Sequence, residues 1–183
     1  MPDVPGQVTA LAYRAGATAA QLVPGSIATP IARAIGRASA PLLPAQRRMA
    51  ARHQRRAVPD SGSVGPTGVE EVFDSYGRYW LEMLRLPAEV RSGAVAAHFA
   101  IEGFEHIEDG LAHGNGVILA LPHLGGWEWG GAWMALRGHR LVAVVERIEP
   151  PELLQWFAEQ RAAIGIDVVP LGPDVSRVVL RAL

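Results

Sequence analysis

The residues best suited to chemistry are His123 and Glu128, which lie five positions apart after a run of apolar residues. A neutral imidazole can take a proton from an alcohol while that alcohol attacks an activated carbonyl. A carboxylate beside the imidazole would fix its tautomer and stabilise the imidazolium, as the third member of a hydrolase triad does. We therefore expect His123 to be a general base with Glu128 as its charge partner.

The two glycines between these residues decide whether the side chains can meet. On one unbroken helix, five positions would place them about 140° apart around the axis. Gly125-Gly126 predicts a turn instead, followed by a helix from about Gly126 to Leu136 that holds Glu128 in its first turn. The carboxylate can then point back to the imidazole, and the positive end of the helix dipole keeps it ionised. Backbone amides near the glycines could hold a developing oxyanion.

The elements that must position these residues alternate between apolar strands and helices. Strands are predicted over residues 98–103, 117–121, 141–145 and 166–169, and helices over 105–113, 126–136, 151–164 and 174–183. This alternation predicts an α/β fold with a mostly parallel sheet flanked by helices. His123 follows the strand 117–121, and ligands in such folds bind beyond the carboxyl ends of the strands.

The first third of the chain has a different pattern. Residues 5–40 are Ala-rich with helical spacing broken at 24–26, and another helix is predicted over 44–57. A helix that begins near Val69 is expected to end at Pro87. Residues 58–67 concentrate Pro, Gly and Ser. They predict a boundary between a helical membrane-associating region, residues 1–60, and an α/β domain, residues 61–183.

Charge is distributed unevenly along the chain. Residues 1–57 hold eight Arg against one acid, whereas residues 58–183 hold nine Arg against seventeen acids. The predicted helix 44–57 carries five of the former: Arg47, Arg48, Arg52, Arg55 and Arg56. We favour an anionic membrane surface as their partner, at about 1 kcal/mol per Arg. Apolar helices flank the arginines without an aromatic base-stacking pattern, so no nucleic acid is expected. The alternatives are a nucleic-acid-binding patch, a solvated face, or purely apolar insertion of residues 8–37.

Composition excludes several chemistries. The chain has no Cys and no Lys, which excludes disulfides, thiolate chemistry, Schiff bases and a phosphate-loop lysine. His106 and His113 lack a third residue at metal-site spacing, and the glycines near residue 114 precede a strand, so neither metal nor nucleotide cofactor is expected. Arg, Pro and Gly interrupt every long apolar run, so we expect no transmembrane helix. Asp3, Pro5 and Arg14 break the residue order of a secretory signal, so none is expected. We expect a peripheral protein on the cytoplasmic face of the cell membrane.

The segment His123-Leu-Gly-Gly-Trp-Glu128 resembles the His-x4-Asp/Glu motif of glycerolipid-type acyltransferases. Its context is similar to the bacterial lipid A biosynthesis acyltransferase family, above all to the actinobacterial branch that acylates phosphatidylinositol mannosides. The stretches that carry the likeness are residues 75–87, 101–105, 116–123, 146–147 and 157–165.

This resemblance implies transfer of a fatty acyl chain from acyl-CoA to a mannose hydroxyl of a phosphatidylinositol mannoside glycolipid. Acyl-CoA would be a co-substrate, with no resident cofactor. His123 and Glu128 would be catalytic, while Glu146 and Arg161 would line the site, Arg161 in contact with the acyl donor. Without the resemblance, Arg161 is typical of a solvated helix face.

Other functions stay open at this point. A lipid A or lysophospholipid acyltransferase would differ only in its acceptor, and a thioesterase would use the same dyad to activate water. The non-enzyme alternative is an inactive lipid-binding remnant. The resemblance also implies a larger sheet and a further acidic motif downstream, so we expect a chain truncated at its C-terminus, weakly folded and catalytically poor.

Overall fold

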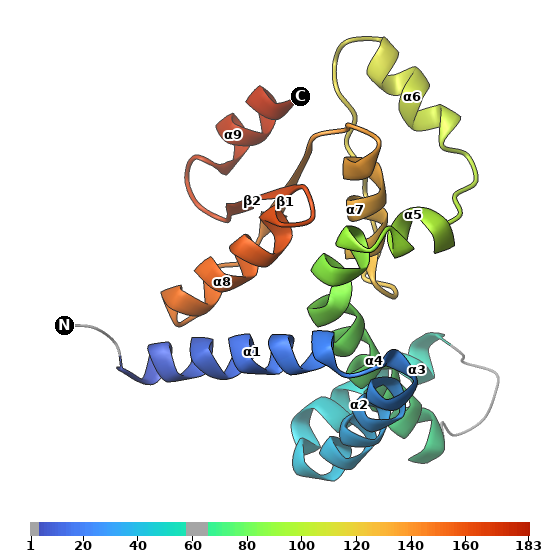
Figure 1. Cartoon of the computed structure of the whole chain (residues 1–183), viewed down its shortest axis with the longest axis vertical. Helices are drawn as coiled ribbons and strands as arrows, with labels where there is room; N and C mark the ends of the chain where they lie inside the picture. Colours follow the sequence, from blue (N-terminus) through green and yellow to red (C-terminus); the bar gives the residue numbers. More distant parts are fainter. Residues whose placement is uncertain (1–3, 58–65) are drawn as a thin grey trace. The chain divides into compact units, whose positions relative to one another are not determined.

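The structure is a computed structural model that describes residues 4–57 and 66–183 (Figure 1). These residues divide into two compact units. The sheet unit contains the chain up to Gly16 together with Leu86–Leu183, and the helical unit contains Ala17–Arg85. Residues 58–65, on which the predicted domain boundary falls, lie outside the described residues. The division into residues 1–60 and 61–183 therefore stays a prediction.

The helical unit is built from four helices and a short 3-10 turn. They are α1 (Val4–Leu22, from Ala17 onward), α2 (Gly25–Ser39), η1 (Ala40–Leu42), α3 (Pro44–Ala57) and α4 (Pro66–Arg91, as far as Arg85). The predicted break at residues 24–26 is confirmed, because Pro24 precedes α2 and its carbonyl accepts from the Ile27 and Ala28 amides. The helix predicted over 44–57 is also confirmed. Association of this region with a membrane stays a prediction.

Small residues and one buried acid join α2 to α4. A Cβ added to Gly36 would lie 2.2 Å from the Phe73 carbonyl oxygen, so the two helix backbones approach as only glycine permits. Asp74 is buried beside this contact; it accepts a hydrogen bond from Arg33 Nε at 2.8 Å and forms an ion pair with Arg37 Nε at 2.7 Å. The close approach and the ion pairs together fix α2 against α4.

The prediction that Pro87 ends its helix is wrong, because α4 continues to Arg91. An interior proline removes one backbone hydrogen bond and costs a helix about 3 kcal/mol. The neighbouring Leu86 is almost fully buried in the core of the sheet unit, and Val90 packs against the same core. Burial of these side chains on the last turns offsets the cost, so tertiary packing overrides the local signal.

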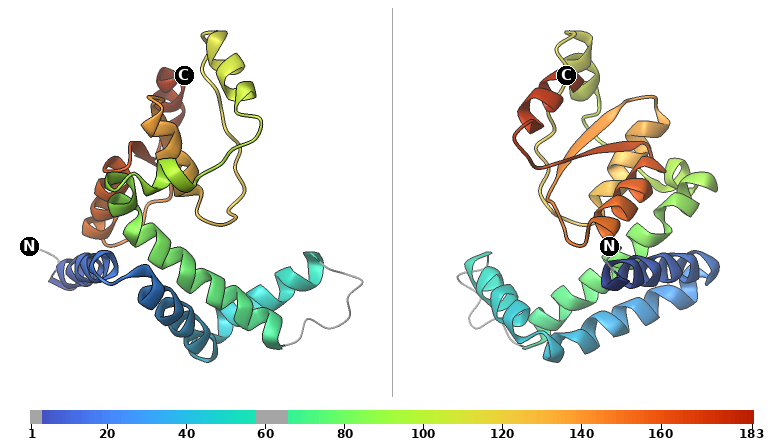
Figure 2. Two further views of the ribbon diagram at one scale, coloured as in Figure 1. Left: turned by 45° about the vertical axis from the view of Figure 1, so that its right-hand side comes forward. Right: turned by 90° about the vertical axis from the view of Figure 1, so that its left-hand side faces the viewer.

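The sheet unit places helices around two parallel strands. Its elements are α5 (Ala94–His98), α6 (Glu105–Ala112), α7 (Trp127–Leu136), β1 (Leu141–Val145), α8 (Pro151–Ala162), β2 (Ile166–Pro170) and α9 (Val175–Ala182). Leu141 lies opposite Ile166 and Val145 opposite Pro170. Helix α8 packs on β2, and α7 and α9 contact both strands (Figure 2). The predicted strands 141–145 and 166–169 and their parallel pairing are confirmed.

Two other predicted strands do not form. Residues 98–103 contain the end of α5 followed by irregular chain, and residues 117–121 are irregular throughout. A strand is stable only when a neighbour satisfies its backbone groups, and the described residues contain only the two-stranded sheet β1-β2. The fold is therefore mostly helical with a small parallel sheet rather than the extensive α/β sheet that the pattern predicts.

The core of the sheet unit lies between α7, α5 and the strands. Its buried residues are Leu86, Val95, Ala132, Trp133, Met134, Ile164 and Ile166. Trp133 is packed by Phe99 and by an edge-on Phe104 ring. This packing fixes α7, and with it the turn that precedes the helix. In the part of the chain that the structure describes, no helix has both the length and the hydrophobicity to span a bilayer.

Candidate active site

The turn before α7 has the geometry that the glycines predict. Gly125 has a φ of +61°, a left-handed conformation that favours glycine, and Gly126 is the N-cap of α7. The Trp129 amide donates to the Gly126 carbonyl at 2.9 Å and closes the first turn. Glu128 lies in that turn and is only 2 % exposed. The local prediction for this helix start is thus confirmed.

His123 lies in the chain just ahead of this turn, and its side chain is exposed. The Leu124 amide donates to the Pro122 carbonyl at 2.8 Å, so the backbone bends tightly at His123 itself. No hydrogen bond joins the His123 ring to Glu128 in the described residues. The structure brings the two residues to the same turn without pairing them, and the dyad stays a prediction.

Glu128 instead forms an ion pair with Arg161. Arg161 Nη2 donates to Glu128 Oε1 at 3.3 Å, and the two side chains are 20 % and 2 % exposed. Arg161 comes from the last turn of α8, so this contact joins two helices across the sheet unit. A carboxylate buried this deeply requires a cation or several hydrogen-bond donors nearby. Arg161 therefore orients the Glu128 carboxylate and offsets part of the cost of its burial.

Two aromatic rings hold the Arg161 guanidinium from the sides. Its central carbon lies 5.4 Å from the centre of the Trp127 ring and 5.9 Å from that of Phe157. Rings at such distances attract a cation through their negative faces. Neither ring was predicted from the sequence, although Trp127 is adjacent to Glu128 and Phe157 is one helical turn before Arg161. These sequence positions do not by themselves place the two rings against the guanidinium, because that contact depends on how α7 and α8 pack.

The first helix supports α8 behind this cluster. The Tyr13 ring lies 5.5 Å from Trp156 and 5.7 Å from Phe157, measured between ring centres. Arg14 Nη2 also donates to Glu159 Oε2 at 3.4 Å. These contacts lie within the sheet unit, and they connect α1 to the helix that carries Arg161.

Glu146 stands apart from the other predicted site residues. It follows the last residue of β1 and is exposed. Its neighbour Arg147 donates from Nε to the Leu171 carbonyl at 2.7 Å, and the Leu171 amide donates to the Val145 carbonyl at 2.8 Å. These bonds fix the backbone at the carboxyl ends of both strands. No recorded contact brings Glu146 to His123, Glu128 or Arg161 in the described residues.

Apolar side chains surround His123 along the sequence. Ile118, Leu121 and Leu124 are 74 %, 60 % and 76 % exposed. Three large apolar side chains left in water within seven positions form a surface that favours a hydrocarbon ligand or a packing partner. Within residues 4–57 and 66–183, no group of three His, Asp or Glu side chains is arranged to hold a metal ion. The arrangement thus offers a base, a buried carboxylate with its cation, and an apolar border.

Comparison with known proteins identifies the family. Residues 2–183 match the bacterial lipid A biosynthesis acyltransferase family. The chain is 33% identical over 171 residues to the phosphatidylinositol mannoside acyltransferase of Mycolicibacterium smegmatis, a match that covers 91% of this chain and 54% of that protein. It is 41% identical over 100 residues to the protein of that name from Mycobacterium tuberculosis, covering 54% of this chain and 32% of the relative. The matched regions thus span about half or less of these relatives. The chain belongs to the bacterial lipid A biosynthesis acyltransferase family.

Proposed function

We propose that this chain carries the catalytic dyad of an enzyme that transfers a fatty acyl group from acyl-CoA to a mannose hydroxyl of a phosphatidylinositol mannoside. The observation that carries the proposal is the position of Glu128, buried in the first turn of α7 and five residues after the exposed His123. The family, and the reaction and acceptor after which the two relatives are named, support the choice of reaction and acceptor.

The chemistry needs one proton carrier. The imidazole of His123 takes the proton of the acceptor hydroxyl while the hydroxyl oxygen attacks the thioester carbonyl carbon. The tetrahedral intermediate then expels the CoA thiolate, which receives that proton from the imidazolium. An ester and free CoA thiol result, so no covalent enzyme intermediate is required.

Glu128 and Arg161 prepare the site for this step. The imidazolium formed during attack is stabilised by the Glu128 carboxylate, provided that the exposed His123 ring turns toward it. Arg161 holds that carboxylate through Oε1 and so limits the directions in which it can point. Arg161, as a cation near the site, also suits an acyl donor that carries phosphates. Glu146, at the end of β1, is proposed as a further charged residue that lines the site.

A product analysis tests the reaction and its substrates. The purified chain, and a form extended to the length of the relatives, would be incubated with labelled acyl-CoA and one acceptor at a time. The acceptors are phosphatidylinositol mannoside, phosphatidylinositol without mannose, and a lysophospholipid. We expect label in the mannoside ester only. Release of labelled fatty acid with every acceptor would identify a thioesterase instead, and label in the lysophospholipid product would identify a different acceptor class.

We also propose that the enzyme binds the cytoplasmic face of an anionic membrane through the arginines of α3. The helix has no buried residue, and all its arginines are exposed. Attraction between exposed charges is screened within about 8 Å at about 0.15 M salt. Binding to anionic vesicles should therefore weaken steeply as salt rises. Equal binding to neutral and anionic vesicles at every salt concentration would favour apolar insertion of residues 8–37 instead.

A further inference from the structure

The arginines of α3 differ from the other arginines of the helical unit in their surroundings. On α2, Arg33 and Arg37 both form ion pairs with the buried Asp74. On α4, Arg78 pairs with Glu82 at 3.4 Å. In the described ranges 4–57 and 66–183, by contrast, no acid pairs with an arginine side chain of α3. The charge of α3 is therefore left for an anion from outside the described chain.

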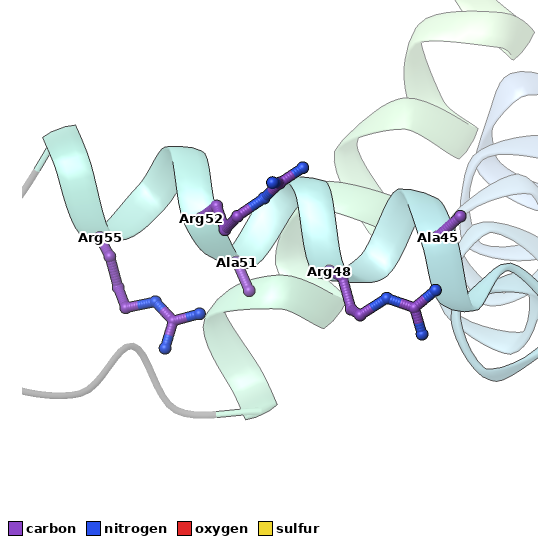
Figure 3. Close-up of a pocket in the computed structure, with 5 residues that line it drawn as sticks. All are labelled: Ala45, Arg48, Ala51, Arg52 and Arg55. Atoms are coloured by element: carbon purple, nitrogen blue, oxygen red, sulfur yellow. The ribbon is translucent and has the colours of Figure 1, made fainter.

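Some of these arginines line an open hollow on one side of α3. The hollow has a volume of about 440 Å³ and is lined by Ala45, Arg48, Ala51, Arg52 and Arg55. Figure 3 shows the Arg48 and Arg55 side chains extending to the same side of the helix, with the short Ala51 side chain between them. Seven residues span about 10 Å along a helix axis. The Arg48 and Arg55 guanidinium groups thus lie on either side of Ala51, whose short side chain leaves the space between them empty.

The start of α4 and the core of the helical unit hold α3 in place. The Gln54 side-chain amide of α3 donates to the Gly68 carbonyl at 2.8 Å, which ties the first turn of α4 to α3. Ala50 and Ala51 also pack against the core of the helical unit, so the floor of the hollow is held in place. Arg47 and Arg56 do not line the hollow, although they belong to the same helix.

We propose that this hollow binds the phosphate-bearing headgroup of an anionic phospholipid, with Arg48 and Arg55 as its principal ligands and Arg52 at its side. A guanidinium donates two parallel hydrogen bonds to phosphate oxygens, which is the geometry that suits arginine to phosphate recognition. A hollow of this volume lies within the range of pockets that hold small ligands. The choice of a lipid over a free phosphate rests on the proposed function.

Two double substitutions on α3 distinguish binding at the hollow from general electrostatic attraction between α3 and the vesicle surface. The whole chain would be sedimented with phosphatidylcholine vesicles that contain phosphatidylinositol. Arg48→Gln/Arg55→Gln and Arg47→Gln/Arg56→Gln each remove two charges from α3. We expect the first pair to weaken binding by about a thousandfold, because charge-assisted hydrogen bonds are lost in addition to general attraction. The second pair loses only general attraction, and we expect about thirtyfold. Equal losses for the two pairs would overturn the proposal.

A charge-preserving variant tests the shape of the site. Arg48→Lys/Arg55→Lys keeps the charge but removes the planar fork, and we expect a loss of about tenfold in vesicle binding. No loss would mean that charge alone suffices, which contradicts a built site. Inorganic phosphate and soluble inositol phosphate serve as competitors. Complete displacement of the protein from vesicles by millimolar inorganic phosphate would identify a free anion as the ligand, and preferential binding to RNA would overturn the lipid assignment.

These experiments test the headgroup site and the proposed catalytic function independently. Vesicle binding is measured without an acyl donor, and His123→Ala is expected to bind vesicles as the unchanged chain does. Loss of acyl transfer with intact vesicle binding would therefore contradict only the catalytic proposal. Loss of the difference between the two paired variants would contradict only the headgroup site.

Discussion

At the scale of single residues, the buried Glu128 carboxylate forms an ion pair with the partly buried Arg161. Substitutions of these two residues, alone and together, test that ion pair. Two charges held in a dry environment stabilise each other only while both are present. Removing one charged side chain leaves the other charge buried without a partner, which is unfavourable. Removing both side chains together leaves no unpaired buried charge.

We predict that Arg161→Met destabilises the fold by about 3 kcal/mol, because Glu128 loses the cation that offsets its burial. Glu128→Gln/Arg161→Met should cost clearly less than the sum of the single changes. Urea unfolding followed by tryptophan fluorescence measures all three free energies of unfolding. Strictly additive free energies would show that the 3.3 Å contact contributes no coupling.

The sequence predicted the start of α7 but not the contact of Glu128 with Arg161. Gly125 and Gly126 are local signals, and a local turn followed by a helix is all that they need to specify. Glu128 and Arg161 lie 33 positions apart, and their contact depends on how α7 and α8 pack. Periodicity cannot provide that distance, so only the family resemblance indicated a role for Arg161. The cation–π contacts of Trp127 and Phe157 were missed for the same reason.

At the scale of elements, the junction of α2 and α4 depends on glycine. Gly36 and Gly77 face each other's backbones: an added Cβ at Gly77 would lie 2.3 Å from the Ala32 carbonyl oxygen. A carbonyl oxygen belongs to the helix backbone and cannot rotate away. The two helices would have to separate to admit even one methyl group.

We therefore predict that Gly77→Ala lowers the free energy of unfolding by about 2 kcal/mol, through overpacking of the α2–α4 contact. Gly16→Ala in α1 is the matched control, because its Cβ would meet no atom within 4 Å. Alanine is the better helix former by about 1 kcal/mol, so the control should be stabilised. The comparison is made by thermal or urea denaturation. A neutral or stabilising Gly77→Ala would contradict the close approach.

The strands and helices also show which structural features the sequence pattern fails to predict. Residues 117–121 have the apolar composition of a buried strand, yet they form no strand, since no described strand lies beside them. Residues 141–145 have the same composition and do form β1, because β2 supplies a neighbour after the α8 crossover. Pro87 was predicted to end its helix, but α4 continues beyond it because Leu86 is buried in the core of the sheet unit. Local pattern predicts helices well here and strands only where pairing is available.

At the scale of the whole molecule, the segment near His123 exposes apolar surface that pairs with nothing in the described chain. Ile118 and Leu121 are more than half exposed. Irregular chain with strand-forming side chains and unsatisfied backbone groups favours association with another chain. The same surface is the apolar border beside the proposed base.

We predict that Ile118→Thr/Leu121→Thr reduces self-association of the purified chain at least about threefold at micromolar concentration. Analytical ultracentrifugation measures the monomer fraction. Leu22→Thr, which also removes a highly exposed leucine but lies in α1, serves as the control and should have a smaller effect. An unchanged distribution in the double variant would show that residues 117–121 are not the associating surface.

The most direct test of the account is the rate of acyl transfer from labelled acyl-CoA to phosphatidylinositol mannoside by His123→Ala, in a form as long as the relatives. His106→Ala is the matched control, since His106 is exposed on α6 and has no place in the proposed chemistry. We expect His123→Ala to lower the rate at least about a hundredfold, as removal of a general base does. Glu128→Gln should lower it less, and His106→Ala should leave it unchanged. Transfer by His123→Ala at the rate of the control would contradict the central claim.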